Sequence, residues 1–322
     1  MGDNTPRVRE GTEHVESWFL RANHPTEPRA IWVKATILCS SAGVAVAEAW
    51  CSLFDGERTQ AARQTVPLDQ ASYTPQRIEV AQTSWQLDGA AQGAIGELSW
   101  DLRWEPIQGL GEPLCLLPTR RLVDAPLPKN KLLTPVPAAR FSGRVGWGDQ
   151  SWELDGWPGM QGHNWGAAHA PEYAWGHCLF MDAQGEPFAV VEGASGRIKL
   201  GPVLSPLLSL LTVRRAGREY RFDRLVDTWR QRPVIDFPRW ELSMRGSDGE
   251  AALVMCGQPD RMVCLGYDQP DGQRAFCLNS KTAQVTLRVN PTDGPAFECT
   301  SSHGGALEFL QPVEHPAVQP VV

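Results

Sequence analysis

The run GWPGMQGHNWGAAHAPEYAWGHC holds the side chains best suited to chemistry. It carries His163 and Trp165, followed by Tyr173, Trp175 and His177. Alternate side chains of an extended backbone share a face, so the first two should project together and the last three should do the same. Small residues between them leave room beside the rings. The pattern predicts strands that present imidazole, indole and phenol groups to an enclosed space.

A turn follows this run, between Asp182 and Pro187. If these two residues pair across the turn, the strand ladder places His177 opposite Glu192, on the face that carries Trp175. A carboxylate next to an imidazole fixes its tautomer and raises its pKa. The pair could then donate or accept a proton over an aromatic-lined pocket.

Each of these groups also has a structural interpretation. The carboxylate opposite His177 can simply satisfy a buried imidazole, and His163, Asn164 and Trp165 can form a hydrogen-bonded cluster that stabilises a turn. Other chemistries find little support, because the sequence contains no GxGxxG before a helix, no Walker loop, no GxSxG and no HExxH motif. We therefore expect no cofactor and no metal.

Composition limits the class of partner. The chain has 322 residues, with 30 basic and 37 acidic side chains and a formal net charge of -7. It contains no clustered basic stretch, so nucleic acid is not an expected partner. The longest apolar run, residues 203–213, is interrupted by Pro206 and is shorter than the roughly 20 residues that span a bilayer. With no signal peptide visible, we expect a cytoplasmic protein without stable membrane insertion, and its oligomeric state stays open.

Alternating apolar residues dominate the chain and predict an all-β fold. Leu98, Trp100, Leu102 and Trp104 would share one face of a strand, with polar residues on the other. A proline-rich stretch, residues 106–137, interrupts the strands and has apolar runs that should pack on the surface. These features predict two β modules, residues 1–138 with the proline-rich connection and residues 139–322.

The run GMQGHNWGAAHAPEYAWGHC, with SWFLRANHPTEPRAIWVK near the N-terminus, resembles the lipocalin-like superfamily of carotenoid 1,2-hydratase (hydroxyneurosporene synthase) and the AttH-type proteins. More distantly it resembles tocopherol cyclase and the lipocalin-like Diels-Alderases. The resemblance implies two lipocalin-like (calycin-type) antiparallel β-barrels or barrel-like modules side by side, with apolar ligands bound in or between them. It also implies a His-x-Trp pair, matched by His163 and Trp165, and a Tyr-x-Asp pair, of which only Tyr173 is present because Trp175 stands in the place of the acid.

The residues and the resemblance together predict a cofactor-independent hydratase or cyclase that acts on an apolar, unsaturated, isoprenoid- or polyene-like molecule. Asp182 and Glu192 are the nearest carboxylates that could replace the missing acid. A carrier of a hydrophobic ligand is the alternative, and a structural module with a filled interior is a third. The expected catalytic residues are His163, His177 and Glu192, and the expected substrate-binding residues are Asn164, Trp165, Tyr173 and Trp175.

Overall fold

The computed structural model describes residues 4–8, 11–200 and 203–321, and nearly all of its regular structure is β-strand. This confirms the all-β prediction. In the described ranges, no helix combines the length and the apolar character needed to cross a bilayer. Short 3₁₀ turns join some strands: η2 (Leu68–Gln70), η3 (Arg120–Leu122), η4 (Leu225–Arg230) and η5 (Pro259–Arg261).

Strands from the first half of the chain form one antiparallel sheet, which has eleven strands in the described residues. In spatial order these are β4 (Thr59–Pro67), β3 (Ala45–Phe54), β2 (Ala30–Cys39), β1 (His14–Asn23), β11 (Gln150–Gly166), β10 (Asn130–Trp147), β9 (Leu98–Pro106), β8 (Ala90–Ile95), β7 (Thr83–Gln86), β6 (Arg77–Val80) and β5 (Ser72–Tyr73). Burial alternates along β9 as predicted, with Leu98, Trp100, Leu102 and Trp104 inside.

The second half of the chain forms a second antiparallel sheet, with ten strands in the described residues. In spatial order the strands of this second sheet are β17 (Arg218–Phe222), β16 (Leu208–Arg215), β13 (Pro187–Gly196), β12 (Tyr173–Met181), β23 (Phe297–Gln311), β22 (Arg274–Pro291), β20 (Gly249–Cys256), β19 (Arg239–Gly246) and β18 (Arg232–Asp236), while β21 (Val263–Asp268) pairs with β22. A separate pair, β14 (Lys199–Leu200) with β15 (Val203–Leu204), lies outside this sheet.

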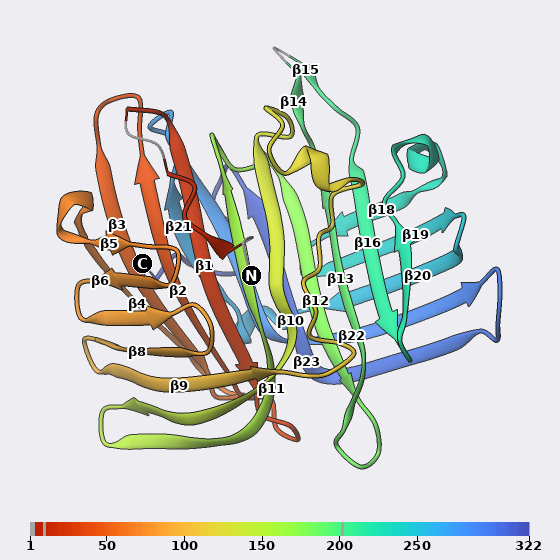
Figure 1. Ribbon diagram of the computed structural model, residues 1–322, viewed down its shortest axis with the longest axis horizontal. Coiled ribbons are helices and arrows are strands. Elements are labelled where there is room, and N and C mark those ends of the chain that lie inside the picture. The colour runs from red at the N-terminus through yellow and green to blue at the C-terminus, as the bar shows by residue number, and fades with distance from the viewer. Residues whose placement is uncertain (1–3, 9–10, 201–202, 322) are drawn as a thin grey trace.

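The two sheets pack against each other, and one of them curls into a half-barrel (Figure 1). Phe19, Trp32 and Trp50 of the first sheet join Trp175 and Tyr267 of the second in a shared hydrophobic cluster. Each sheet also has an apolar cluster of its own on its other side. Strand β1 is buried along its whole length because it is covered on both faces.

The predicted module boundary at residues 138 and 139 falls inside β10, which pairs with both β9 and β11. The chain leaves the first sheet after β11 and enters the second at β12, so the change of sheet lies between Gly166 and Tyr173. The hairpin of β10 and β11, and not the proline-rich connection, therefore directly precedes the point where the chain changes sheets. The division into two modules stays a prediction.

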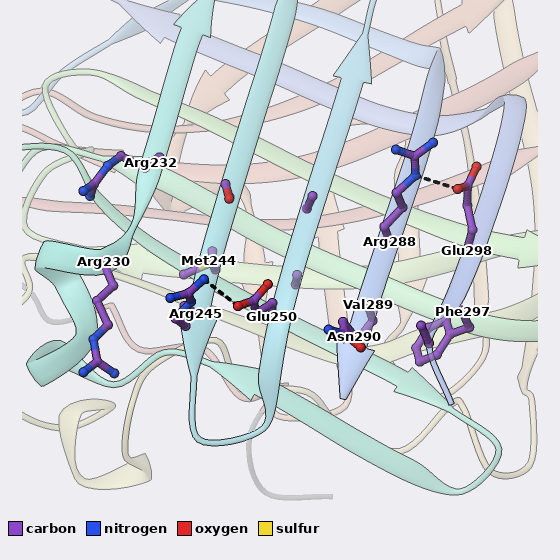
Figure 2. A pocket seen from close by; sticks show the side chains of 14 residues that line it. Arg230, Arg232, Met244, Arg245, Glu250, Arg288, Val289, Asn290, Phe297 and Glu298 are labelled. Carbon is purple, nitrogen blue, oxygen red and sulfur yellow. Dashed lines mark hydrogen bonds and ion pairs between the residues drawn. The ribbon is translucent and has the colours of Figure 1, made fainter. Parts of the chain in front are cut away.

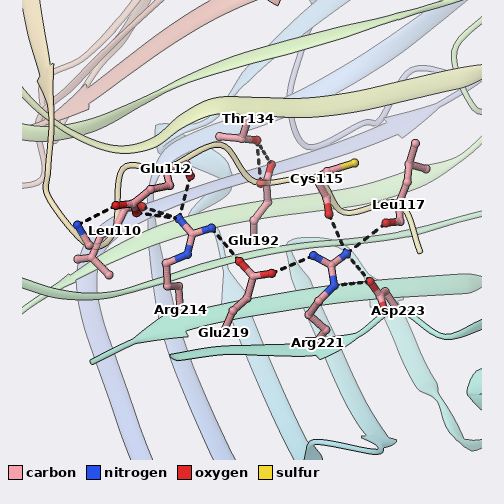
Figure 3. A network of polar contacts seen from close by, with 11 residues as sticks. Leu110, Glu112, Cys115, Leu117, Thr134, Glu192, Arg214, Glu219, Arg221 and Asp223 are labelled. Atoms are coloured by element: carbon pink, nitrogen blue, oxygen red, sulfur yellow. Dashed lines mark hydrogen bonds and ion pairs between the residues drawn. The ribbon is translucent and has the colours of Figure 1, made fainter. Parts of the chain in front are cut away.

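The proline-rich connection between β9 and β10, residues 107–129, makes main-chain contacts with both sheets through its first half, and we call it the strap (Figure 3). An isolated bridge joins Leu114 of the strap to Thr134 of β10. Two arginines of the second sheet bind strap carbonyl groups: Arg214 donates to Leu110 and Glu112, at 3.0 and 2.8 Å, and Arg221 donates to Cys115 and Leu117, at 2.9 and 3.1 Å. The strap therefore spans both sheets.

Close contact between β1 and β11 depends on Gly159, and we expect Gly159→Ala to lower the free energy of unfolding by about 1–3 kcal/mol. A Cβ atom there would lie 2.2 Å from the carbonyl oxygen of Arg21 and 2.5 Å from the Phe141 ring. In the control Gly246→Ala the nearest atom is 3.6 Å away, so this change should be close to neutral. Urea unfolding compares the two, and equal effects would contradict the prediction.

Candidate functional site

Strand β1 separates two enclosed spaces, because alternate side chains point to opposite faces of a strand. Trp18 joins the cluster inside the first sheet, whereas its neighbour Phe19 joins the cluster between the sheets. Pairing of β1 with β11 sets Trp18 opposite His163 and Ser17 opposite Asn164. The side chain of His163 therefore points to the face of the first sheet that carries Trp18. The side chain of Asn164 points the other way, toward the second sheet.

A carboxylate with two histidines lies inside the first sheet, and we call Glu16, His14 and His163 the inner cluster. Glu16 accepts hydrogen bonds of 2.8 Å from Nε2 of both histidines. Burial alone would raise the pKa of Glu16, but these hydrogen bonds hold it below its usual value. The His163 ring lies 4.7 Å, between centroids, from both Trp18 and Trp165. The predicted His-x-Trp pair thus shares one face, with a carboxylate that the sequence pattern did not reveal.

His177 lies on the other side of β1, between the sheets, and is opposite Glu192 in the ladder of β12 and β13, as predicted. Its side-chain partners are different. The Nδ1 atom accepts a hydrogen bond of 2.9 Å from Arg21, and Nε2 donates to the carbonyl of Pro137 at 2.8 Å. Because a guanidinium only donates, the ring is held as the neutral Nε2–H tautomer. Burial and the charge of Arg21 lower the pKa of His177 well below its usual value, so the predicted rise in its pKa is wrong.

Glu192 is the buried acid of the space between the sheets. Thr134 Oγ1 donates to its two carboxylate oxygens at 2.7 and 2.8 Å (Figure 3), and Trp175 Nε1 donates at 3.1 Å. Burial raises the pKa of Glu192 to about 7, although these hydrogen bonds act in the opposite direction. Near neutral pH the carboxyl group is therefore protonated about half of the time, which suits a group that gives a proton and takes it back.

The predicted site residues consequently do not meet in one hollow. His163 faces the cluster that contains Trp18, and Trp165 lies beside it and packs against Cys115 and Leu117 of the strap. Trp175, His177 and Glu192 lie between the sheets instead. The physical reason is that β1 and β11 form a wall with two covered faces, and the change of sheet after β11 turns β12 toward the outer face of that wall. Two separate polar sites result.

Two lysines also face the space between the sheets, and the sequence pattern did not predict them. Lys281 donates through Nζ to Glu308 and lies 4.7 Å from the ring centroid of Trp32. Lys34 Nζ lies 4.0 Å from the ring centroid of Tyr267, and burial lowers the pKa of Lys34 to about 8. Lys34 is the one charged residue in the otherwise apolar run AIWVKATIL, and that is the signal that marks it.

We call Trp175, His177, Glu192, Lys34 and Lys281 the inter-sheet site. The rings of Trp175 and His177 are stacked, with centroids 6.5 Å apart, and Lys281 Nζ lies 5.9 Å from the Trp175 ring. The arrangement brings together a carboxyl group that can hold a proton, aromatic faces that can stabilise positive charge and ammonium groups that can bind an anion.

Two further predicted residues lie at the rim of this site. Tyr173 is partly exposed and joins the same cluster as Trp175, as its spacing predicts. Burial, with the nearby thiol of Cys277, raises the pKa of Tyr173 well above its usual value, so its phenol stays protonated. Asn164 accepts a hydrogen bond of 2.9 Å from Ser17 and faces away from its neighbours in β11.

A pocket of about 170 Å³ opens beside the inter-sheet site. Arg21, which binds His177, lines it together with Asn23, His24 and His303. The Nε atom of Arg21 and Oδ1 of Asn23 are buried and have no hydrogen-bond partner in the described ranges. This pocket brings polar surface and water-sized space next to the buried histidine.

A larger concavity, about 1000 Å³, lies at one end of the second sheet (Figure 2). Its arginines are matched by acidic neighbours: Arg245 pairs with Glu250 and Arg288 with Glu298, each at 2.6 Å. None of the predicted site residues lines it. Its charged, exposed wall does not suit an apolar ligand.

No metal centre is formed by the residues that the structure describes, since no group of three or more His, Cys, Asp and Glu side chains lies close enough to hold an ion. All eight cysteines are free thiols. Burial raises the pKa of several of them, taking that of Cys51 well above its usual value and that of Cys178 to about 12. These thiols stay protonated and behave as small apolar side chains.

Two packed antiparallel sheets, one of them curled into a half-barrel, give the protein a lipocalin-like fold. The chain belongs to the tocopherol cyclase-like family, whose model matches residues 56–309. Two uncharacterised proteins of Mycobacterium tuberculosis, from strains CDC 1551 and H37Rv, are 25% identical over 288 residues, which is 88% of this chain and 84% of each relative.

Two solved structures share the fold at low sequence identity. A protein of Nitrosomonas europaea assigned to AttH aligns with a TM-score of 0.58 and 12% identity, covering 95% of both chains. Kievitone hydratase from Nectria haematococca aligns with a TM-score of 0.55 and 11% identity, covering 92% of this chain and 88% of that one. These two structures confirm the predicted fold class, and the match to the family model confirms the predicted relation to tocopherol cyclase.

We expect Glu192→Gln to flatten the pH dependence of stability. The folded-state pKa of about 7 lies above the ordinary value of 4.5, so the contribution of Glu192 to the free energy of unfolding is present below pH 4.5 and is lost as the pH rises through about 7. For a fully buried carboxyl, a shift from 4.5 to about 7 corresponds to about 3 kcal/mol. Urea unfolding at about pH 5 and about pH 8 measures this loss.

The exposed carboxylate of Glu153 supplies the matched control, because Glu153→Gln should keep the wild-type pH dependence. The amide in Glu192→Gln still accepts from Thr134 and Trp175, so the variant should fold. A stability loss of the same size in wild type and Glu192→Gln would show that Glu192 does not carry the raised pKa.

Proposed function

We propose that the protein is a hydratase or cyclase that protonates a carbon–carbon double bond of an apolar, isoprenoid- or polyene-like small molecule in the inter-sheet site. One observation carries the proposal: the fully buried carboxyl of Glu192, with a pKa of about 7, is hydrogen-bonded to the indole of Trp175. Only an acid that still holds its proton can give it to an alkene. Burial keeps that proton on Glu192 near neutral pH.

The proposed reaction begins when the O–H bond of Glu192 breaks and a C–H bond forms at one alkene carbon. This leaves a carboxylate and a carbocation, which the faces of Trp175 and Tyr173 stabilise by about 2 kcal/mol or more in the absence of water. In hydration, water adds to the cation and its proton returns to Glu192. In cyclisation, a hydroxyl group or second alkene of the same molecule closes the ring, and the proton released returns to Glu192. The acid is regenerated, and the balance requires no cofactor.

His177 serves as a positioning residue in this proposal, because both of its ring nitrogens are engaged by Arg21 and Pro137. His163 is the second candidate for proton transfer, since its hydrogen bond with Glu16 forms an acid–base pair inside the first sheet. That pair would act only on a ligand bound on the other side of β1. Activity measured on variants of each acid distinguishes the two spaces.

The names of related proteins support this choice of chemistry. The family is named for a cyclase, and one protein of the same fold is named a hydratase. Both names fit reactions that begin with protonation of a double bond and differ in the group that captures the cation. Analysis of the product decides between hydration and cyclisation.

We expect turnover when the protein is incubated with prenylated phenols or acyclic polyenes in H₂O and D₂O and the products are analysed by mass spectrometry. Hydration adds the mass of one water, whereas cyclisation leaves the mass unchanged; in D₂O both place deuterium on carbon. Glu192→Gln should lower kcat by about 10²-fold or more, because its amide cannot donate the proton. Glu153→Gln should retain wild-type activity.

Two results would contradict this assignment. Loss of activity in His163→Ala with full activity in Glu192→Gln would move the chemistry to the inner cluster. An unchanged ligand that co-purifies with wild type and Glu192→Gln alike, without product from either, would indicate a carrier.

A further inference from the structure

The pocket of about 170 Å³ beside His177 is lined by Arg21, a guanidinium that has no carboxylate partner in the described part of the chain. Arg21 is 2% exposed and donates to the carbonyl of Gly304 at 2.7 Å and to the neutral imidazole of His177 at 2.9 Å. Both partners are uncharged. The Nε atom of Arg21 is buried and has no hydrogen-bond partner among the described residues. A buried charge without a counter-ion is costly, so this pocket is suited to an anion.

The surroundings of Arg21 do not balance its charge. Burial lowers the pKa of Arg21 to about 10, and the thiol of Cys178 is the one described group that acts in the opposite direction. That thiol has a pKa of about 12 and is therefore uncharged near neutral pH. The pocket wall adds the imidazoles of His24 and His303 and the hydroxyl groups of residues 300–302. Among the described residues that line it there is no Asp and no Glu.

Asn23 contributes an unmatched acceptor to the same pocket. It lies two residues after Arg21 in β1, so the two side chains share a face of the strand. The amide nitrogen of Asn23 donates to the carbonyls of Lys281 and His303, at 2.7 and 3.1 Å, which fixes the orientation of the amide. Its Oδ1 atom is buried and has no partner in the ranges that the structure describes. An occupant that matches both residues must accept a hydrogen bond from Arg21 and donate one to Asn23.

We propose that this pocket binds a small oxyanion that still carries a proton, of the hydrogen phosphate type. A charged oxygen of the ion accepts a hydrogen bond from Nε of Arg21, and its O–H group donates to Oδ1 of Asn23. Water could make both hydrogen bonds, but it would leave the charge of Arg21 unbalanced. Sulfate would balance the charge, but it has no hydrogen for Asn23. The inference goes beyond the proposed function and does not depend on it.

The pocket has the size and the access that such an ion requires. Its volume is several times the roughly 30 Å³ that one water molecule occupies in the liquid. Exposed residues, Pro25 and Thr300, line it together with the buried Arg21 and Asn23. The pocket therefore reaches from the surface to the unmatched atoms, and an ion can enter without separating the two sheets.

Isothermal titration calorimetry of the full chain at pH 6, with phosphate and with sulfate, tests the proposal. We expect phosphate to bind about 10-fold more tightly than sulfate, because sulfate leaves the buried acceptor of Asn23 unmatched. Arg21→Gln should weaken phosphate binding by about 10-fold or more. Thr300→Asp adds a carboxylate to the exposed wall and should weaken it by about fivefold or more. The control Ser99→Asp makes the same change of charge at an exposed residue of β9 outside the pocket, and it should keep the affinity within about twofold.

Methyl phosphate identifies the source of the ion, because phosphate monoesters are about half protonated at pH 6. An affinity equal to or higher than that of phosphate would assign the site to a phosphorylated compound, and a lower affinity would assign it to free phosphate. Either result agrees with the proposal.

A wild-type protein that binds no phosphate would leave water as the occupant and overturn the proposal. Equal affinities for phosphate and sulfate would do the same, and so would equal weakening by Thr300→Asp and Ser99→Asp. If Arg21→Gln does not fold by circular dichroism, Thr300→Asp decides the question, because its side chain is exposed. Calorimetry requires no turnover, so its result and that of the Glu192 assay are independent.

Discussion

The structure depends on the burial of β1 on both faces. A strand covered on one side can direct its polar residues to water, but β1 carries Glu16, Arg21 and Asn23 in a fully buried position. Each must find a partner inside the protein, because an unmatched buried charge is costly. Glu16 finds two histidines on one side, and Arg21 finds His177 on the other. The two polar sites are therefore consequences of where this strand lies.

Much of the local structure was predictable from the sequence, because alternation determines which residues share a face. The strand pattern around Trp100 and the opposition of His177 and Glu192 are both present in the structure. What alternation cannot determine is which sheet covers each face. The short interval between Trp165 and Tyr173 contains the change of sheet, so a pattern that looks continuous in sequence is divided between two spaces.

The sequence also could not predict the hydrogen-bond partners of His177 and Glu192. A cross-strand pair implies proximity, yet His177 is matched by Arg21 from β1 and Glu192 by Thr134 from β10. Trp175 stands where the resemblance leads one to expect an acid, and its indole holds the carboxylate of Glu192. The chain thus places an acid on the neighbouring strand next to the position that lacks one. That the acid lies on β13 instead of β12 can be recognised only from the pairing of the two strands.

The strap has an evolutionary consequence. Arg214 and Arg221 bind its main-chain carbonyl groups, which every amino acid possesses. Selection can therefore preserve the path of this segment while its side chains diverge. Sequence drift in the strap need not displace Thr134, which is joined to it through the backbone at Leu114. Among relatives, the two arginines should be a better guide to an intact covering of Glu192 than the identity of any residue that they hold.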